Sequence, residues 1–337
     1  MHMPPEAATS DILEPRDAAS IVWQRLTPER WPLPLDVLPV GTALVGGAVR
    51  DALLGRVRDC PDLDLVVEGH AADLATALRA RCGPKRLSHC LLHPAFGTVE
   101  LCFDGLHLDL ATARAELYPA PGRNPEVTPG SLQADLSRRD FTINAMALDL
   151  LSGELIDPYG GCGHLETRQL VFLHGASVSD DPTRVIRAAR YGARLGFGLD
   201  PSSLEQLNAT IAAWPWAWWS GDPPAQAPPA LSTRCRMELD RLFSNEPWEQ
   251  ALQRLERWGA LGLIDPALQG DPSWCRRLRW ALRLGLPCLP ALLLGASDPL
   301  ATASRLQLPG QHQQWLKQAL ELRAWLRCNA PSDQAAP

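Results

Sequence analysis

The spacing of hydrophobic and polar positions changes near residue 165. Between residue 41 and that point, short apolar stretches alternate with polar turns and glycines, which predicts strands mixed with helices. Beyond it, apolar residues recur mainly every three or four positions, which predicts helices alone. We therefore expect an α+β part followed by an all-helical part.

In the first part, Asp104-Gly105 is a strong signal for a hairpin between two strands. Strands are predicted at 42–45, 62–67, 97–102 and 106–110, and helices at 48–54 and 71–81. Residues 116–137 contain four prolines and are expected to form a long polar loop. Segments 141–150 and 154–157 close this part.

The second part contains one strong interruption of its helical period. Residues 214–230 are rich in tryptophan and proline and separate the first two helices. Helices are predicted at 183–195, 231–243, 247–261, 273–284 and 311–326. We interpret 214–230 as an inserted surface loop with packed tryptophans.

Composition narrows the class of protein. With 337 residues, of which 46% are hydrophobic, the chain can bury a sizeable core, which excludes wholesale disorder. No apolar stretch reaches the roughly 18 residues of a spanning helix, and the first residues do not resemble a signal peptide. The nine cysteines form no CxxC pair, so we expect reduced thiols in a cytoplasmic protein. A net charge of -6 argues against indiscriminate coating of nucleic acid.

The candidate chemistry begins with Asp62 and Asp64. Spaced i, i+2 on a strand, their side chains share one face. Two carboxylates at such a short distance repel each other unless a cation lies between them. Mg²⁺ prefers oxygen ligands of this kind. An exposed strand face is the alternative, because this short pattern is common.

Two further features favour phosphate chemistry. Gly46-Gly47 follows a strand and opens a helix, where backbone N–H groups can approach a phosphate, and Arg50 lies one turn further on. Asp109, on a later strand, can supply a third carboxylate or be a solvated edge residue. A glycine turn and three carboxylates are what nucleotidyl transfer with two metal ions requires.

Several motifs together resemble the class II tRNA nucleotidyltransferase and bacterial poly(A) polymerase family. They are VGGAVRD (45–51), DLDLV (62–66), RRDFTINAM (138–146), DDPTRVIRAAR (180–190) and RCRMEL (234–239). The resemblance covers about 41–265 and implies a polymerase-β-like head with a mixed sheet, followed by a helical neck and body. It divides the chain into an N-terminal arm (1–40), a head (41–165), a neck (166–245) that contains the 214–230 insert, and a short body and tail (246–337).

The resemblance also assigns residues to roles. Two Mg²⁺ ions would be held by Asp62, Asp64 and Asp109. The nucleotide would be bound by Gly46, Gly47, Arg50, Arg139, Asp140 and Asn144. The base would be read by Asp181 and Arg184, with Arg187 and Arg190 lining the pocket.

The residues around the base-reading motif allow a second interpretation. Arg184, Arg187 and Arg190 share one helix face, which a triphosphate, an RNA backbone or neighbouring acidic residues would neutralise. Asp181 precedes Pro182 at a position typical of a helix N-cap, so reading a base requires that one carboxylate oxygen remain available. Asp accepts and Arg donates hydrogen bonds, a pattern that suits the amino groups of cytosine and adenine and rejects the carbonyl groups of uracil and guanine.

The resemblance therefore implies addition of CCA to the tRNA 3′ end from CTP and ATP. CC-only addition, A-only addition, poly(A) synthesis and a catalytically silent RNA-binding protein are the alternatives. The stretch 93–98 resembles the tRNA enzymes, and the 114–137 loop resembles one that CC-only members tend to lack, so we favour full addition. Asp180 stands where the family usually has Glu, and the tryptophans of 214–230 offer a weakly supported alternative role in stacking on RNA bases.

Overall fold

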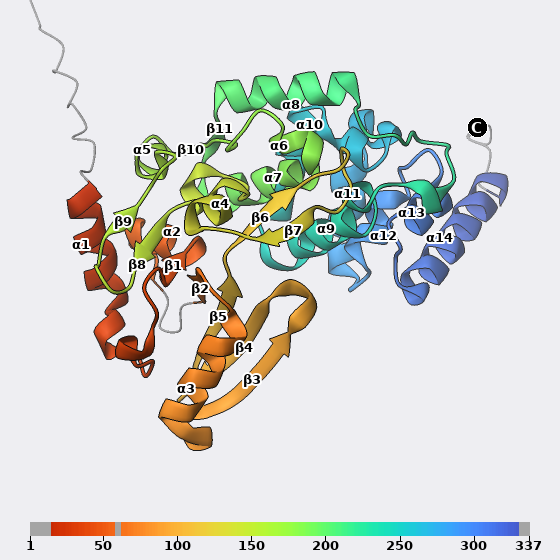
Figure 1. Cartoon of the computed structure of the whole chain (residues 1–337). Helices are drawn as coiled ribbons and strands as arrows, with labels where there is room; N and C mark the ends of the chain where they lie inside the picture. Colours follow the sequence, from red (N-terminus) through yellow and green to blue (C-terminus); the bar gives the residue numbers. More distant parts are fainter. Residues whose placement is uncertain (1–14, 58–61, 330–337) are drawn as a thin grey trace, which may run out of the picture. The chain divides into compact units, whose positions relative to one another are not determined.

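The computed structural model describes residues 15–57 and 62–329, and the chain divides into two compact units (Figure 1). The first unit contains the residues up to Leu117 together with Glu126–Leu173. The second contains Tyr118–Pro125 and the residues from His174 onward. Expectations that concern residues 1–14 or Cys60 fall outside the described residues.

The first unit is built on a mixed sheet of seven strands, which confirms the predicted α+β class. The strands are β1 (Ala43–Val45), β2 (Leu63–Val67), β3 (Leu87–His93), β4 (Thr98–Phe103), β5 (Leu106–Thr112), β8 (Ala147–Asp149) and β9 (Leu155–Ile156). Their order across the sheet is β3-β4-β5-β2-β1-β8-β9. β2 and β5 run parallel, and the other neighbouring pairs are antiparallel.

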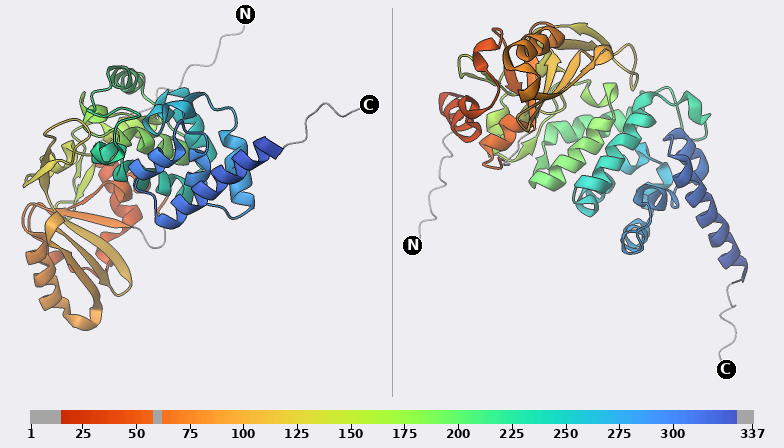
Figure 2. Two further views of the ribbon diagram at one scale, coloured as in Figure 1. Left: turned by 90° about the vertical axis from the view of Figure 1, so that its right-hand side faces the viewer. Right: turned by 90° about the horizontal axis from the view of Figure 1, so that it is seen from below.

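Helices pack on both faces of this sheet and leave part of one face open. The helices are α1 (Pro15–Leu26), α2 (Gly47–Leu53), α3 (Ala71–Arg86), α4 (Leu132–Ser137) and α5 (Gly161–Glu166). α3 packs along β3, β4 and β5 (Figures 1 and 2). Leu101, Leu108 and Leu110 are buried, whereas Glu100 and Asp109, which alternate with them, are exposed. The strand period therefore presents the acidic side chains on the face away from α3.

The N-terminal segment is described from residue 15 and packs on the head. α1 contacts α2 and β9. The Arg25 guanidinium donates to the carbonyl oxygens of Ala52 and Leu53, at 2.6 and 3.0 Å. These carbonyls lie at the C-terminal end of α2, where helical carbonyls lack intrahelical partners. α1 therefore anchors the helix that follows the glycine turn.

The prediction of a long loop over 116–137 is wrong. This stretch contributes to a two-stranded antiparallel hairpin, β6 (Arg114–Leu117) and β7 (Glu126–Pro129), and then to α4. Three of the four prolines lie in the 118–125 connection. Pro129 ends β7, where a missing N–H interrupts only the end of the ladder. β7 is exposed along its whole length, so its sequence lacks the alternation of hydrophobic and polar residues that predicts a strand.

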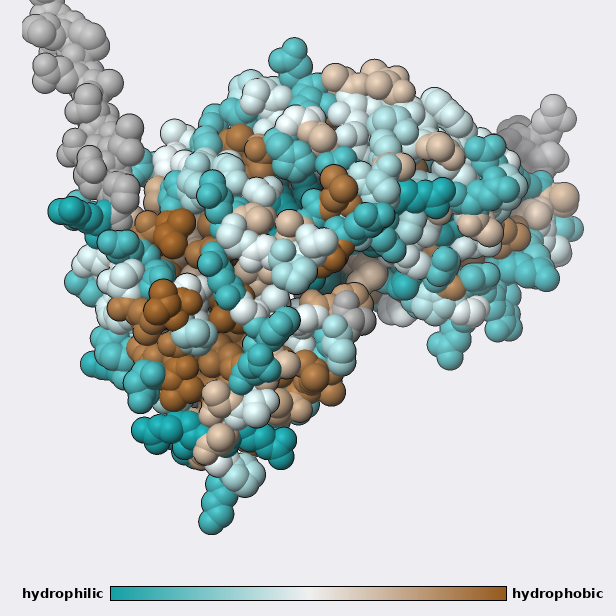
Figure 3. Space-filling model, viewed as in Figure 1, coloured by the Kyte–Doolittle hydropathy of each residue, from teal (hydrophilic) through white to brown (hydrophobic). Residues whose placement is uncertain are grey.

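The sequence prediction also missed β3. Most of its positions are exposed, and Leu91 and Leu92 are buried no more than their polar neighbours. Because both kinds of residue face solvent, the two-residue period of a half-buried strand is absent. Figure 3 shows apolar side chains gathered on the visible face of the first unit.

The second unit is helical apart from β11 (Gly198–Leu199). Its helices are α6 (Ser177–Asp180), α7 (Thr183–Leu195), α8 (Pro201–Ala213), α9 (Thr233–Asn245), α10 (Trp248–Arg257), α11 (Trp274–Arg283), α12 (Cys288–Leu293), α13 (Pro299–Arg305) and α14 (Gly310–Asn329). α7 matches its predicted bounds and packs against α9 and α10. α8 was not predicted, although Asp200 caps it by accepting from the backbone N–H groups of Ser202 and Ser203. α14 lies at the outer end of this unit (Figure 2).

The 214–230 segment has only short 3₁₀ turns, at Pro224–Gln226 and Pro229–Leu231, the second ending one residue beyond it. Trp216 and Trp218 are buried in this segment, whereas Trp219 is 59% exposed. None of the helices in the described ranges is long and apolar enough to cross a bilayer.

Candidate active site and nucleotide-binding residues

The sheet register brings the predicted carboxylates to one face. Asp64 on β2 is the direct partner of Asp109 on β5 in the parallel pair. Asp62 precedes β2 by one residue, so alternation directs it to the same face as Asp64. All three residues are exposed. This is the face of the sheet that α3 leaves uncovered.

The carboxylates influence one another's protonation. Although Asp64 reaches solvent, partial desolvation raises the pKa of Asp64 to about 6; Arg139 opposes this, and Asp109 and Asp62 add to it. Desolvation also raises the pKa of Asp109, and Glu100 and Asp62 raise it further. Desolvation is the larger cause of both pKa shifts, and the cost of gathering negative charge on one face adds to it. A cation bound there would remove that cost.

The donor set fits Mg²⁺, since carboxylate oxygens are hard ligands with the charge that a divalent ion needs. As the side chains stand, no three acidic, histidine or cysteine residues among those described converge closely enough to hold a metal. The fit therefore rests on the mutually repelling pair formed by Asp64 and Asp109.

The glycine turn lies between β1 and α2, and its conformation depends on the absence of a side chain. Gly46 has φ 72° and ψ −123°. A Cβ on this residue would lie 2.8 Å from Nη1 of Arg139. The positive φ and the lack of space for a side chain both favour glycine. The guanidinium of Arg139 lies directly against the turn.

A buried polar chain links this turn to the 138–146 motif. Asp140 accepts at Oδ1 from the backbone N–H of Phe141 and from Asn144 Nδ2, each at 2.9 Å. Asn144 Oδ1 accepts from Arg50 Nη1 at 2.6 Å, and Arg50 Nε donates to Asp51 at 2.8 Å. Arg50, Asp140 and Asn144 are all buried. Their shared contacts hold the start of α2 against the second motif.

Arg139 is oriented by a residue that the sequence analysis missed. Asp135 on α4 is fully buried; Oδ2 accepts from Arg139 Nη2 at 2.8 Å, and Oδ1 accepts from Arg138 Nε and Nη2 at 3.0 and 2.6 Å. Burial alone would raise the pKa of Asp135, but Arg139 and Arg138 outweigh it and hold that pKa below its usual value. Arg138 and Arg114 both donate to Glu116 on β6. In the sequence, the spacings of three and four residues from Asp135 to the arginines could have indicated these ion pairs.

One N–H group of Arg139 is not used in a hydrogen bond to the described residues. Its Nε is buried and has no hydrogen-bond partner among the described residues. Arg139 also lowers the pKa of Asp64, so its positive charge acts at the carboxylate face. A guanidinium fixed by Asp135, touching the glycine turn and influencing Asp64, is suited to an anionic substrate.

The residues to which the resemblance assigns base reading, Asp181 and Arg184, belong to the second unit. Asp181 is buried, and its Oδ1 accepts from the backbone N–H and hydroxyl of Thr183, at 3.0 and 2.6 Å. Its Oδ2 accepts from Arg234 on α9. The capping interaction considered from the sequence is therefore present. Arg184 Nη1 lies 3.2 Å from His174 Nε2. Burial and Arg184 lower the pKa of His174, which favours a neutral imidazole that accepts this hydrogen bond.

Acidic side chains partner the arginine face of α7. Arg190 is buried and pairs with Glu238 on α9 and with Glu246, which follows α9. Arg187 lies 3.9 Å from Glu238, and Glu246 also lies 3.5 Å from Arg194. The alternative of acidic partners is thus realised, with Glu238 on α9 and Glu246 in the turn after it. The roles of Arg187 and Arg190 toward a nucleotide stay a prediction.

Comparison with known proteins agrees with this architecture. Residues 42–171 match the family described as the Poly A polymerase head domain. The CC-adding tRNA nucleotidyltransferase of Deinococcus radiodurans is 39% identical over 287 residues, covering 82% of this chain and 70% of that protein. The A-adding tRNA nucleotidyltransferase of Aquifex aeolicus is 44% identical over 173 residues, covering 50% of this chain but only 20% of that protein.

Solved structures show the same fold. The apo form II of a CCA-adding enzyme superposes with a TM-score of 0.74 at 25% identity, over 92% of this chain and 75% of that one. A tRNA nucleotidyltransferase complexed with a primer tRNA and an incoming ATP analog superposes with a TM-score of 0.62 at 28% identity, over 86% and 81% of the two chains. The α+β head and helical region thus define a nucleotidyltransferase architecture. The chain belongs to the tRNA nucleotidyltransferase family.

Proposed function

We propose that this chain adds nucleotides from CTP and ATP to the 3′ end of tRNA, building or repairing the CCA sequence. The observation that carries the proposal is the parallel register of β2 and β5, which places Asp64 opposite Asp109 on the face of the sheet away from α3. Arg139, beside the Gly46 turn, also acts electrostatically on Asp64. Membership of the family and the tRNA complex of a solved relative support tRNA as the substrate.

In this proposal Asp62, Asp64 and Asp109 hold two Mg²⁺ ions. When bound, the ions neutralise charge on the triphosphate and favour ionisation of the attacking 3′ hydroxyl. The chain's own residues position the reactants. Gly46 lets the backbone and Arg139 approach an anion closely, and the buried contact between Arg50 and Asn144 keeps the turn in place. Such positioning and charge stabilisation supply most of the catalysis in phosphoryl-transfer chemistry.

Base selection is assigned to Asp181 and Arg184. Asp181 Oδ2 accepts from Arg234 and, as a carboxylate oxygen, has the capacity for a second donor. The amino group of cytosine or adenine can supply that donor, whereas the carbonyl of uracil or guanine cannot. An unmatched buried acceptor costs about 1–3 kcal/mol, which disfavours UTP and GTP without a nucleic-acid template.

Full CCA addition is the preferred product, and CC-only addition is the second candidate. The first is supported by the 114–137 segment, whose Arg114 and Glu116 join the network that orients Arg139. The second is favoured by the name of the Deinococcus relative, which matches most of this chain.

The test uses three forms of one tRNA, ending at the discriminator base, after one C and after two. Each is incubated with CTP, ATP or both, and the products are resolved to single nucleotides. We expect CC with CTP alone and CCA with both substrates. Arrest at CC with ATP present would establish the second candidate, and long A tails on unrelated RNA would refute both. Asp64→Asn is the matched inactive variant; tRNA binding without transfer by the wild-type chain would identify a silent RNA-binding protein.

A further inference from the structure

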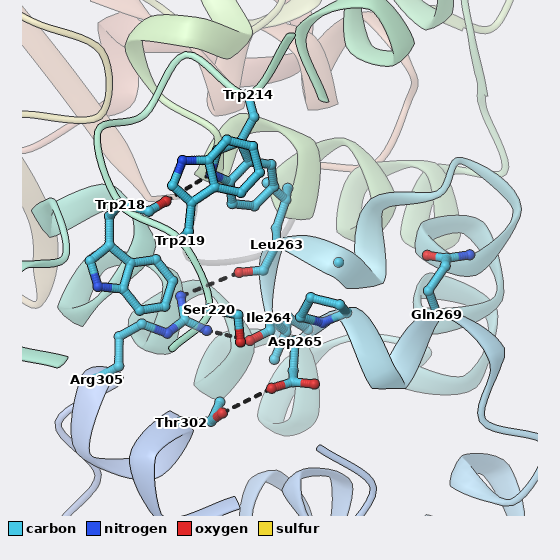
Figure 4. A pocket seen from close by; sticks show the side chains of 12 residues that line it. Trp214, Trp218, Trp219, Ser220, Leu263, Ile264, Asp265, Gln269, Thr302 and Arg305 are labelled. Carbon is cyan, nitrogen blue, oxygen red and sulfur yellow. Dashed lines mark hydrogen bonds between the residues drawn. The ribbon is translucent and has the colours of Figure 1, made fainter. Parts of the chain in front are cut away.

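The tryptophan-rich segment of the second unit borders a cavity of about 510 Å³. Figure 4 shows this cavity between the indoles of the segment and the turn that follows α10. Its lining includes Trp214, Trp218, Trp219, Leu263, Ile264 and Pro266. Most of the lining is apolar, but Trp219 leaves 59% of its surface exposed. A large aromatic ring beside an open apolar cavity marks a binding site.

Trp219 is held in place before any ligand arrives. Its ring stacks on that of Trp214, with centroids 5.4 Å apart and an interplanar angle of 29° (Figure 4). Trp214 in turn meets Trp216 edge to face at 5.0 Å. The backbone N–H of Trp219 donates to Asp222 Oδ2 at 2.7 Å. A fixed ring loses little conformational entropy on binding a partner.

The indole N–H groups distinguish Trp219 from its neighbours. Trp214, Trp216 and Trp218 each donate Nε1–H to a backbone carbonyl, at 2.7, 2.9 and 3.2 Å. The Nε1–H of Trp219 makes no hydrogen bond to another described residue. Three indoles are therefore structural, and the fourth offers a ring face and an unused donor.

The inner wall of the cavity is rigid. Arg305 is buried, lies 4.8 Å from the Trp218 ring centroid and donates to the carbonyl oxygens of Leu263 and Ile264 (Figure 4). Asp265 is also buried and accepts from Thr302 Oγ1 at 3.1 Å. Because these charged groups are satisfied internally, they fix the wall rather than attract a free ion.

The chemistry of the site selects its ligand. The second unit carries 18 basic and 15 acidic residues, whereas the first carries 14 and 23, so a polyanion is favoured on the second. The cavity itself presents no available cation for a phosphate. It presents an aromatic face, an apolar floor and a few donors, among them Trp219 Nε1–H and the Ser220 hydroxyl, which together match a nucleobase.

We propose that Trp219 and this cavity bind one unpaired base of the RNA substrate, with the base stacked on the indole. This inference rests on the proposed function only in taking RNA as the substrate. The base bound here is separate from the incoming nucleotide that Asp181 and Arg184 are assigned to read.

The experiment compares Trp219→Ala, Trp219→Phe and Trp219→Leu with Trp280→Ala, which removes a 54% exposed indole from α11 in the same unit. Equilibrium binding of tRNA is measured without nucleotides, and KM is measured for tRNA and for CTP. We expect Trp219→Ala to raise the tRNA dissociation constant and KM by about 5- to 150-fold, the range for loss of one stacked base. Phe is expected to restore most of the affinity and Leu little, and KM for CTP is expected to stay unchanged.

Several outcomes overturn the inference. Equal effects of Trp219→Ala and Trp280→Ala, or full affinity in Trp219→Leu, would show that no aromatic stacking occurs. A raised KM for CTP alone would assign the cavity to the free nucleotide. If Trp219→Ala does not fold, the Phe and Leu variants still separate stacking from apolar contact. Binding is measured without transfer, so an inactive wild-type chain refutes the proposed function and leaves this test intact.

Discussion

Replacing Asp135 by Asn tests whether a buried carboxylate orients the arginine beside the glycine turn. The wild-type side chain accepts three N–H groups, two from Arg138 and one from Arg139. Asn keeps the shape but loses the charge and one acceptor oxygen. Asp135 is fully buried, so we expect it to act only through the guanidinium groups that it holds.

The structure sets the size of the effect. Removing one partner from a buried ion pair costs about 3–5 kcal/mol. Arg138 keeps its hydrogen bond to Glu116, at 3.1 Å, so the lower part of that range applies and we expect a loss of about 3 kcal/mol. For a unit of this size, that loss lowers Tm by about 6–12 °C. Lowered stability alone leaves KM for the nucleotide unchanged at temperatures well below Tm.

Kinetics separate orientation from folding. At such a temperature we expect Asp135→Asn to raise KM for CTP about 10-fold or more, since a charge-assisted hydrogen bond contributes about 1.5–3 kcal/mol. A double-mutant cycle with Arg139→Gln provides the control, because the effect of Asp135→Asn on KM should largely disappear when Arg139 is absent. Arg138→Gln removes the other partner and should lower Tm with less effect on KM. Additive effects of Asp135→Asn and Arg139→Gln on KM would refute the positioning role.

The same residue gives a prediction for acid stability. The folded-state pKa of Asp135 lies below its usual value of 3.8. Its contribution to the free energy of unfolding is therefore present in full above the usual carboxyl pKa and is lost as pH falls through the folded value. Acid titration of Tm should be less steep below that pKa in Asp135→Asn than in the wild type. Parallel Tm curves for the two proteins would contradict the assignment.

The remaining predictions concern the turn, the carboxylates and the base reader. Gly46→Ala should cost about 1–3 kcal/mol of backbone strain and raise KM for CTP by displacing Arg139, whereas Gly105→Ala, also at positive φ but in open space, should lower only Tm. Asp64→Asn should lower kcat by about 100-fold or more with tRNA affinity retained, as single-turnover and binding assays would show. Asp181→Asn places an amide donor beside the base, so incorporation of UTP relative to CTP should rise by about 5- to 150-fold in a competition assay.

The common face of the three carboxylates could be predicted from the sequence because it depends on local patterns. The i, i+2 spacing of Asp62 and Asp64 fixes their common side, and the Asp104-Gly105 turn fixes the hairpin that carries Asp109. Asp104 and Gly105 both have positive φ, as such a two-residue turn requires. Only the pairing of β2 with β5 required knowledge of the folded chain.

The partners of the arginines could not be predicted in the same way. Arg190 is 48 residues from Glu238 and 56 from Glu246, and no period links those positions. A row of arginines on one helix face therefore looks the same in sequence whether it awaits phosphate or meets carboxylates from a neighbouring helix. The arginine spacing on α7 predicted a charged helix face but not which groups neutralise it.

In the proposed function, Asp181 makes structural contacts and reads a base with the same carboxylate. Oδ1 accepts two hydrogen bonds from Thr183, which uses its acceptor capacity, while Oδ2 accepts from Arg234. One acceptor position on Oδ2 then remains for an amino group, and Thr183 and Arg234 fix its direction. A carboxylate free to rotate would adapt to many bases and discriminate poorly between them. In the proposed function, the capping contact to Thr183 therefore also holds the carboxylate in the orientation that reads the base.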